Sequence, residues 1–383
     1  MSDERTRFET LAVHGGEPRP AVDGSVVFPI FQGTVFEADP GSSTGDVRYI
    51  RLGTNPSQRH LHRRLAALEG AEAAVATASG MAAITSALHS ALGTGDHVIA
   101  AGAFYGGTHQ FLAEHADRLG WAFDLVDPGD EDAWRRALRP NTKAFLTETI
   151  TNPLIQVGDL VGAARFAREH RLTSIIDNTF ATPVVFRPHT VGFDLVCHSA
   201  TKALNGHSDI AAGVVTGSRE RIERVSSVLS AYGSSLDPHA AFLLARGLKT
   251  LALRVRQQNN NAQAVAEFLA AHDSIAQVRF PGLPEHPDHE RAAELFDGFG
   301  SVLTFQPIGG AAAAEILVKS LRLPYAASSL GGVESLVTRL VVDGHAGSAP
   351  CAIAGLTDGA IRFSAGIEAA EDLVADFAQA LEA

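Results

Sequence analysis

The sequence predicts an α/β fold in which a mostly parallel sheet of seven strands carries helices on both faces. Short apolar runs alternate with longer segments of helical periodicity between residues 60 and 216. This alternation is typical of β-α-β units, whose crossover helices cover a parallel sheet from both sides. The chain has 383 residues. Because single hydrophobic cores stop growing at roughly 250 to 300 residues, we expect two domains.

The seven apolar runs are interpreted as strands in chain order. They cover residues 73–77, 97–101, 122–126, 143–148, 173–177, 194–198 and 211–217. Helices are predicted between them, one beginning at Met81 and one over residues 109–119. Gly80 separates the first strand from the first of these helices.

Two further parts flank this sheet domain, which we place at residues 55–247. Residues 1–54 are rich in Gly, Pro and Ser and show little periodicity, so they form an arm that cannot build its own core. Residues 248–383 predict a smaller α+β domain. It has a long helix over 249–272, strands at 301–307 and 360–366, and a last helix over 371–383.

Composition and charge exclude several classes of partner and compartment. The net charge is −12, and no Lys/Arg cluster predicts binding to nucleic acid. Residues 73–95 carry no charge over a length that could span a bilayer, but Ser, Thr, His and Gly interrupt them, so no membrane span is predicted. The first ten residues lack the apolar core of a secretory signal, which favours the cytoplasm.

Cysteine, histidine and glycine patterns point away from other kinds of site. Cys197 and Cys351 form no CxxC pair and are interpreted as packing thiols in a reducing compartment. His60 and His62 lie two apart on a predicted helix and face different ways, and no metal site is predicted. No GxSxG, GxGxxG or GxxxxGK[ST] motif follows a predicted strand, which disfavours a serine hydrolase and a nucleotide-binding protein.

Polar side chains follow five of the predicted strands. Because the carboxyl ends of parallel strands meet at one edge of a sheet, these side chains should lie close together. Among them are a lysine, a carboxylate, an aromatic ring and a Ser-Gly at a helix start, where free N–H groups favour a phosphate. In chain order they are Ser79, Gly80, Met81, Tyr105, Asn152, Asp177, Asn178, Ser199, Thr201 and Lys202.

A site for pyridoxal 5'-phosphate requires this combination of groups. A lysine forms a Schiff base with the cofactor aldehyde, and a carboxylate keeps the ring nitrogen protonated so that the ring can accept electrons. Lys202 lies between two apolar runs and next to Ser199 and Thr201, whose hydroxyls can bind the phosphate. Taken singly, each residue has a structural explanation as a cap, turn or packing residue; their occurrence at successive strand ends favours the cofactor site.

The chain resembles the pyridoxal-phosphate enzymes of cysteine and methionine metabolism, which include cystathionine γ-synthases, cystathionine lyases and homoserine sulfhydrylases. The resemblance covers nearly the whole chain. It is carried by the segments "VHGG", "RYIR", "LEGAEAAVATASGMAAI", "FYGGTHQF", "TETITNPL", "IIDNTFATP", "HSATKALNGHSDIAAG", "RGLKTLALR", "PGLPEHPDH", "SSLGGVESL" and "IRFSAGIEAAEDL". It implies the fold called fold-type I and an enzyme that acts on a small amino acid.

The resemblance also implies roles for individual residues. Lys202 would be the Schiff-base lysine and proton carrier, Asp177 the partner of the ring nitrogen, and Tyr105 the residue that stacks on the ring. The phosphate would be held by Gly80, Met81, Ser199 and Thr201, with Tyr49 and Arg51 reaching in from a neighbouring subunit. Asn152 would lie near the ring hydroxyl of the cofactor. Ser329 and Arg362 would bind the substrate carboxylate, with Asn152 and Tyr49 also contacting the substrate. The enzyme would be a homo-oligomer of dimers with shared sites, expected to be a tetramer.

The reaction implied by the resemblance is elimination at a carbon–sulfur bond, as in cystathionine γ-lyases. The alternatives are γ-replacement on an O-acylhomoserine, as in γ-synthases and sulfhydrylases, and β-elimination. Three features depart from the family pattern. Ser328 stands where many γ-synthases and γ-lyases have glutamate, Gly107 stands where methionine γ-lyases have cysteine, and the tract over 339–356 is unusual.

Overall fold

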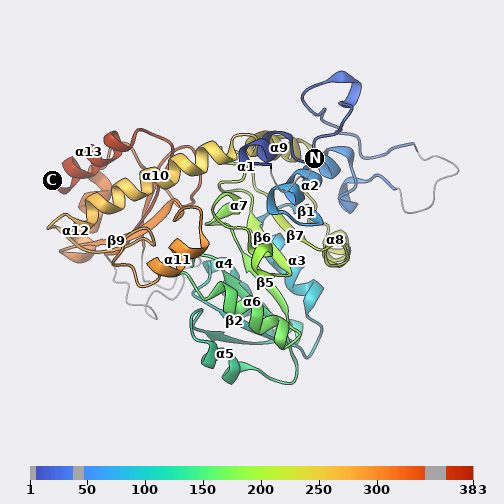
Figure 1. Ribbon diagram of the computed structural model, residues 1–383, viewed down its shortest axis with the longest axis horizontal. Coiled ribbons are helices and arrows are strands. Elements are labelled where there is room, and N and C mark those ends of the chain that lie inside the picture. Colours follow the sequence, from blue (N-terminus) through green and yellow to red (C-terminus); the bar gives the residue numbers. More distant parts are fainter. Residues whose placement is uncertain (1–5, 38–46, 341–358, 383) are drawn as a thin grey trace.

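The computed structural model describes residues 6–37, 47–340 and 359–382. It has two sheets, one in each half of the molecule (Figure 1). The larger sheet has seven strands in the order β1-β7-β6-β5-β4-β2-β3, and five of them (β3, β2, β4, β5 and β6) pair in parallel. The predicted mostly parallel sheet of seven strands is confirmed. The strands are β1 Ala73–Thr77, β2 His97–Ala101, β3 Ala122–Val126, β4 Thr142–Glu148, β5 Thr173–Asp177, β6 Leu195–Ser199 and β7 Gly213–Gly217.

Strand β7 runs antiparallel to both of its neighbours, β6 and β1. The reason is the connection that precedes it. Residues 200–212 form a loop without a helix between β6 and β7, and a connection without a crossover helix brings the chain back in the opposite direction. This loop contains Lys202, and it is anchored at both ends because it connects two neighbouring strands inside the sheet.

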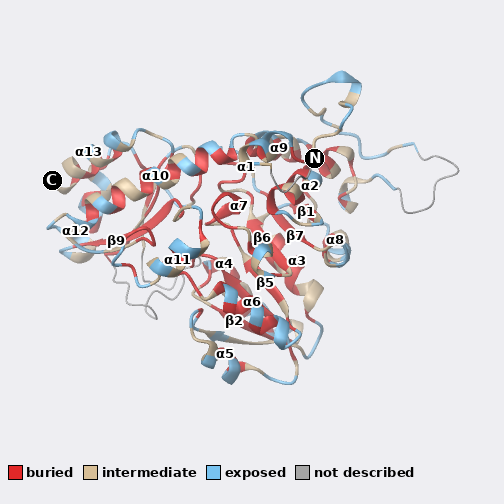
Figure 2. Ribbon diagram, in the orientation of Figure 1, coloured by how far each residue is buried: buried red, intermediate tan, exposed pale blue. Residues whose placement is uncertain are grey.

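Helices cover both faces of the large sheet, and each strand alternates its side chains between two cores. Val98 of β2 packs in the core under helices α3, α4 and α8, whereas Ile99 packs in the core under α2, α6 and α9. Figure 2 shows the inner strands of this sheet as largely buried, whereas the edge strand β3 is only partly covered. The helices of this half are α2 Pro56–Glu69, α3 Gly80–Ala91, α4 Gly106–His115, α5 Glu131–Ala137, α6 Leu160–Glu169, α7 Thr182–Val185, α8 Arg219–Tyr232 and α9 Pro238–Leu248.

Side-chain caps explain where several of these helices begin. Asn55 accepts from the N–H of Ser57 and forms a capping box with Gln58 ahead of α2. Ser79 accepts from the N–H of Ala82 at the start of α3. These caps satisfy N–H groups that have no partner within the helix. Ser79 therefore fixes where the α3 N-terminus lies relative to β1.

The second half is built on a five-stranded sheet in the order β10-β11-β12-β9-β8. The predicted strands at 301–307 and 360–366 correspond to its central pair, while the other three strands escaped prediction because they are short or largely polar. The strands are β8 Ile275–Arg279, β9 Val302–Pro307, β10 Tyr325–Ala326, β11 Leu336–Arg339 and β12 Ile361–Ser364. The helices are α10 Leu251–Ala270, α11 His289–Leu295, α12 Gly310–Ser320 and α13 Ala370–Leu381. The domain limits drawn from the sequence stay predictions.

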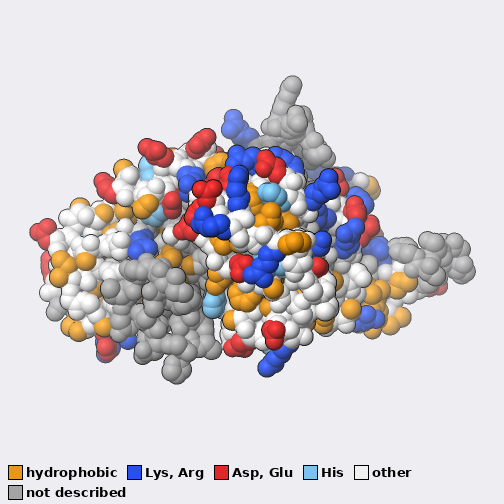
Figure 3. Space-filling view, turned by 90° about the horizontal axis from the view of Figure 1, so that it is seen from below, with side chains coloured by type: hydrophobic (Ala, Val, Ile, Leu, Met, Phe, Trp, Pro, Cys, Tyr) orange, Lys and Arg blue, Asp and Glu red, His pale blue; other side chains and the backbone are white. Residues whose placement is uncertain are grey.

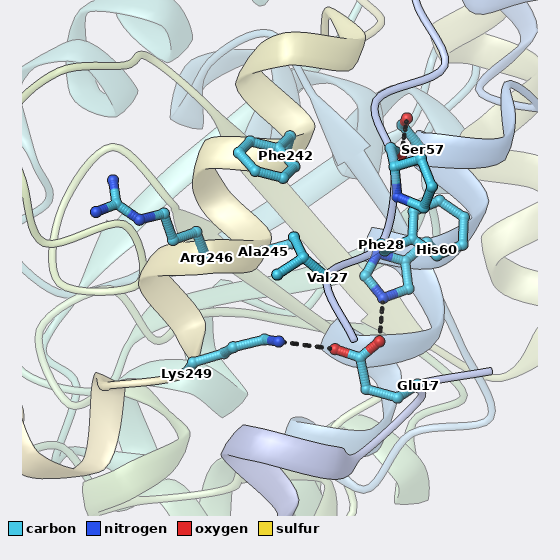
Figure 4. A pocket seen from close by; sticks show the side chains of 10 residues that line it. Glu17, Val27, Phe28, Ser57, His60, Phe242, Ala245, Arg246 and Lys249 are labelled. Atoms are coloured by element: carbon cyan, nitrogen blue, oxygen red, sulfur yellow. Dashed lines mark hydrogen bonds and ion pairs between the residues drawn. The ribbon is translucent and has the colours of Figure 1, made fainter. Parts of the chain in front are cut away.

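The N-terminal arm packs on the large half through one partly buried acid, Glu17. After helix α1 (Phe8–His14), the Glu17 carboxylate lies 2.9 Å from His60 Nε2 and 3.4 Å from Lys249 Nζ (Figure 4). Glu17 also contacts the guanidinium of Arg64. The ring of Phe28 stacks on His60 with centroids 4.0 Å apart. Burial lowers the pKa of His60 to about 4, so this histidine is neutral at pH 7. The arm thus contacts helix α2 and the C-terminal end of helix α9.

On the face shown in Figure 3, Lys and Arg side chains are interspersed with Asp and Glu. Within the described residues no helix is both long and apolar enough to cross a membrane. In the same part of the chain, no three metal-ligating side chains cluster. In the loop at 281–288, His286 is buried, with 8% of its surface exposed.

Candidate active site

A cavity of about 610 Å³ opens at the carboxyl ends of the parallel strands. Ligand sites of open α/β sheets lie at this edge, and the volume suits a small-molecule ligand. Residues from both halves line the cavity. The predicted site residues that it brings together are Gly80, Met81, Tyr105, Asn152, Asp177, Ser199, Thr201, Lys202, Ser329 and Arg362.

Lys202 lies in the loop after β6 and points toward the second half of the molecule. Its Nζ donates to the hydroxyl of Ser329 at 2.6 Å. Burial, together with the nearby Arg362, lowers the pKa of the lysine. A lower pKa increases the fraction of uncharged amine, which is the form that acts as a nucleophile or a base.

Asp177 ends β5 directly beside Glu148, which ends β4 in the adjacent register position. Oδ1 of Asp177 accepts hydrogen bonds from both the hydroxyl and the backbone N–H of Thr179, which leaves Oδ2 available to a ligand. Burial raises the pKa of Asp177. Burial and the Asp177 charge raise that of Glu148 well above its usual value. Two buried acids at one edge favour a cation as their ligand.

The start of α3 has the geometry of a phosphate cradle. Gly80 and Met81 occupy its first turn, where N–H groups lack helical partners. A Cβ at position 80 would lie 2.7 Å from the Ser199 Cβ, so only glycine allows this approach. The Thr201 hydroxyl lines the same cavity, but it exchanges hydrogen bonds with the backbone of Ala212. To donate to a phosphate, it would have to give up its bond to that carbonyl.

Arg362 enters the cavity from β12 of the second sheet. Its two terminal nitrogens donate to Asn152 Oδ1 at 3.1 Å and to the Ser329 carbonyl at 3.2 Å. Ser329 has φ = 110°, a backbone conformation that non-glycine residues rarely adopt and that costs about 1–3 kcal/mol. Its two bonds, to Lys202 and Arg362, hold it in that conformation. A planar guanidinium in this position can take a carboxylate bidentately.

Tyr105 lies at the mouth of the cavity and is 48% exposed. Its backbone N–H donates to Oε1 of Glu148 at 2.8 Å, which positions the tyrosine at the start of α4. A Cβ at Gly107 would lie 2.6 Å from Cε1 of this ring. A cysteine at position 107 would therefore displace the ring from its present place.

Tyr49 and Arg51 do not line the cavity. Arg51 donates to the Ser230 carbonyl at 3.2 Å, and its guanidinium lies 5.5 Å from the centre of the Tyr49 ring. Arg51 lies in the turn Ile50–Leu52, which packs against α8, and α8 in turn packs on the edge strand β1. Within one chain Tyr49 and Arg51 are thus separate from the other predicted site residues, and their assignment to a neighbouring subunit stays a prediction.

The sequence reasoning missed several residues that line or support the cavity. Glu148 is the last residue of the fourth apolar run, so its terminal position was the available signal. Thr179 bonds Asp177 and also accepts from the backbone N–H of Ser199 at 2.8 Å, linking two strand ends. Ser328, noted from the sequence as a departure from the family pattern, lines the cavity as well. Much of the unusual tract at 339–356, with Cys351, lies outside the described residues, whereas Cys197 is buried.

These donors fit pyridoxal 5'-phosphate. The α3 N-terminus and the Ser199 hydroxyl suit its phosphate, the buried acids suit a protonated ring nitrogen, and the Lys202 amine suits its aldehyde. A protonated ring nitrogen would supply a positive charge that stabilises the neighbouring carboxylates of Asp177 and Glu148. The fold and the site therefore define a pyridoxal-phosphate enzyme.

Comparison with known proteins identifies the family. Residues 9–382 match the family described as Cys/Met metabolism PLP-dependent enzyme. The chain is 40% identical over 378 residues to cystathionine gamma-lyase of Bacillus subtilis (strain 168), covering 98% of this chain and 99% of that one. It is 39% identical over 390 residues to cystathionine gamma-synthase of Mycobacterium tuberculosis (strain CDC 1551 / Oshkosh), covering all of both.

A solved structure agrees with these relatives. Cystathionine gamma-lyase from Lactobacillus plantarum, complexed with L-serine, superposes with a TM-score of 0.93 at 36% identity, covering 98% of this chain and 99% of that chain. The chain belongs to the Cys/Met metabolism PLP-dependent enzyme family, whose cofactor is pyridoxal 5'-phosphate. Its fold is the fold-type I architecture that the resemblance implied.

Proposed function

We propose that this protein is a carbon–sulfur lyase that removes the γ-substituent of cystathionine. Support comes from the similarity to a cystathionine gamma-lyase over nearly the whole of both chains. The alternatives are γ-replacement on an O-acylhomoserine, supported by the similar γ-synthase, and β-elimination of cystathionine. All of these reactions begin with loss of the substrate α-proton.

The observation that carries the proposal is the linked set Lys202, Ser329 and Arg362 in one cavity. Arg362 would bind the substrate carboxylate, which fixes the α-carbon near the Lys202 amine. Burial lowers the pKa of that amine, which favours the uncharged form that takes the α-proton, and the Ser329 hydroxyl holds the amine in place. When bound, the cofactor supplies the electron sink that stabilises the negative charge left on the α-carbon.

Removal of a γ-substituent requires a second deprotonation, at the β-carbon of the substrate. Lys202 is the one lysine that lines the cavity among the described residues, so it is assigned both transfers. Asp177 and Glu148 would stay beside the cofactor ring and hold its nitrogen protonated. Because replacement uses the same transfers, these residues support either outcome.

Product analysis tests the proposal. The purified enzyme, loaded with pyridoxal 5'-phosphate, is given cystathionine, homocysteine, methionine, or O-acylhomoserine with cysteine, and the products are identified by mass spectrometry. Cysteine and 2-oxobutyrate from cystathionine support γ-elimination. Pyruvate with homocysteine supports β-elimination, and a new thioether from O-acylhomoserine with cysteine supports replacement. Either of these results, without 2-oxobutyrate from cystathionine, overturns the γ-lyase assignment.

Loading is checked on the same preparation. Borohydride reduction and peptide mapping should place the cofactor on the peptide that contains Lys202, and Lys202→Ala should lose this label. The Ala variant should also lose turnover by well over the 10²–10⁴-fold typical of a general base, since nucleophile and base vanish together. A label on another peptide would contradict the assignment of this lysine.

The wider organisation is also part of the proposal. Residues 55–247 would bind the cofactor, residues 248–383 would close the substrate side, and residues 1–54 would reach a neighbouring subunit. Val26 and Val35 of the arm are 88% and 85% exposed, which supports a covering chain. We assign the protein to the cytoplasm as a homo-oligomer of dimers, forming a tetramer.

A further inference from the structure

A second polar cavity lies at the amino ends of the parallel strands, on the side of the large sheet opposite the main cavity. Its volume is about 320 Å³, and Thr173 and Ser174, the first residues of β5, line it. The same strand ends with Asp177 in the main cavity. Because a strand rises about 3.3 Å per residue, the length of β5 separates the two sites. The second cavity is therefore no extension of the first.

Three arginines surround this cavity, in a chain whose net charge is −12. Arg168 comes from the last turn of α6, Arg171 from the turn between α6 and β5, and Arg221 from the first turn of α8. They come from different elements, so the chain fold rather than a single basic helix face brings them together.

Both carboxylate oxygens of Asp194, the acid that lines the cavity, already have partners within the protein. Its Oδ1 pairs with Nη2 of Arg221 at 2.8 Å, and its Oδ2 accepts from the backbone N–H and the hydroxyl of Ser174 at 2.9 and 3.0 Å. Arg221 also donates to the Thr173 hydroxyl at 3.2 Å. One of the three positive charges is neutralised, and two remain.

The two remaining arginines have no carboxylate partner among the described residues within the 4.0 Å of an ion pair. Both are exposed. Arg171 has φ = 55°, a left-handed conformation that glycine or asparagine adopts at lower cost. A Cβ at Gly192 would lie 3.5 Å from Arg168 Nη1, an ordinary van der Waals contact, which places the Arg168 guanidinium beside Gly192 at this side of the cavity.

We infer that this cavity binds a phosphate group. Guanidinium forks bind phosphate oxygens bidentately, and two unpaired forks around a pocket that also offers hydroxyl groups match a doubly charged oxyanion. The volume equals about ten water molecules in the liquid, so a small phosphate ester fits as well as free phosphate. The inference is independent of the reaction proposed for the main cavity.

Calorimetric titration tests the site on the cofactor-loaded enzyme, in which pyridoxal 5'-phosphate occupies the cradle at α3. Inorganic phosphate is titrated at constant ionic strength, balanced with sodium chloride, and β-glycerophosphate is titrated in parallel. We expect saturable binding of one phosphate per chain. Tighter binding of the ester would identify a phosphate ester as the ligand, and equal or tighter binding of inorganic phosphate would identify free phosphate.

Two substitutions remove the unpaired charges without disturbing the backbone. Arg168→Gln keeps a helix former, and Arg171→Asn keeps a residue that tolerates the left-handed conformation. Each should raise the Kd for phosphate about tenfold or more, because a charge-assisted hydrogen bond is lost; tenfold corresponds to about 1.4 kcal/mol. Far-UV circular dichroism and turnover should match the wild type.

Arg165→Gln is the matched control. Arg165 lies one turn earlier on α6, does not line the cavity and pairs with Glu131 at 2.7 Å. Its loss changes the net charge equally but should leave phosphate binding unchanged. Absence of saturable binding in the wild type would overturn the inference, as would an equal effect of the control substitution or unchanged affinity in the Arg168→Gln, Arg171→Asn double variant.

Discussion

Arg362 joins the two halves of the molecule at the level of single side chains. It extends from the second sheet and donates to Asn152 in the loop after β4, while its other nitrogen donates to the carbonyl of Ser329. Through Ser329 it is linked to Lys202, 127 residues away in sequence from that serine. The distance between the proposed carboxylate-binding group and the proposed base is thus set by two hydrogen bonds.

Replacing this arginine by lysine should weaken substrate binding more than it slows chemistry. Arg362→Lys keeps the charge but removes the planar fork, so we expect KM to rise about tenfold or more, as for loss of one charge-assisted hydrogen bond, with a smaller change in kcat. Steady-state kinetics on cystathionine measure both. Arg339→Lys on the neighbouring strand β11 is the control, because Thr338 and Leu340 line the cavity and Arg339 does not. An unchanged KM would move the carboxylate site elsewhere.

Glu148 offers a test through the pH dependence of stability. Its pKa in the folded protein is raised by burial and by Asp177, so folding favours the protonated acid. This contribution is complete below the unfolded pKa of about 4.3 and is lost as the pH rises toward the folded value. Glu148→Gln removes the titration. The free energy of unfolding of the variant, relative to wild type, should therefore increase as the pH rises from 4 toward 8.

Urea unfolding of the cofactor-free protein at a series of pH values measures this difference. Glutamine accepts only one of the two backbone N–H bonds of Glu148, from Tyr105 and Asn152, which adds a constant offset at every pH. Glu114→Gln removes a charge from an exposed glutamate and controls for net charge. A difference that falls as the pH rises would show that the acid is ionised more easily in the folded protein than in the unfolded chain.

At the scale of elements, the arm and helix α2 depend on one another through Glu17. Arg64 is fully buried on α2, and its guanidinium bonds Glu17 and the carbonyls of Ala12 and Val13. The arm thus covers a buried positive charge that α2 alone could not hold. Removal of one partner from a buried ion pair leaves the other charge uncompensated.

Glu17→Gln should therefore release the arm and cost about 3–5 kcal/mol in the free energy of unfolding. Chemical denaturation measures the loss, and amide hydrogen exchange should increase over residues 6–37 and α2. Glu9→Gln is the control, because Glu9 pairs with Arg256 at an exposed site and its loss should change little. Equal effects of the two substitutions would contradict the role given to Glu17.

At the scale of the whole molecule, the separation of Tyr49 and Arg51 from the cavity of their own chain predicts shared sites. Arg51→Ala should weaken binding of the cofactor phosphate in the main cavity, and Lys202→Ala should abolish the reaction. Neither homodimer should therefore turn over well. In a hybrid dimer one site carries both defects and the other carries neither. After random exchange about half of the dimers are hybrids, so activity should return to about a quarter of wild type.

Differently tagged subunits verify that exchange has occurred in this experiment. Mixing each variant with itself provides the baseline, and mixing two wild-type preparations provides the upper limit. If tagged hybrids form and activity stays at the baseline, Arg51 and Lys202 serve the same chain's site. The dimer would then have independent sites.

The sequence by itself determined the large sheet and the residues at its strand ends. Alternation of apolar runs and helical segments is a local property, and β5 and its terminal Asp177 appear at the predicted positions. The loop with Lys202 follows β6 for the same reason. The polar residues that end these strands are local as well, and together they predict the cofactor from the sequence.

Only the tertiary structure decided which distant groups meet. The pairing of Glu148 with Asp177 depends on the β4–β5 register, and the commitment of Thr201 to Ala212 depends on the reversal of β7. The short strands β10 and β11 exist because neighbouring strands supply their hydrogen bonds, which composition cannot show. The arginines around the second cavity come from α6, its following turn and α8, and no spacing along the chain encodes a contact among elements that meet only after folding.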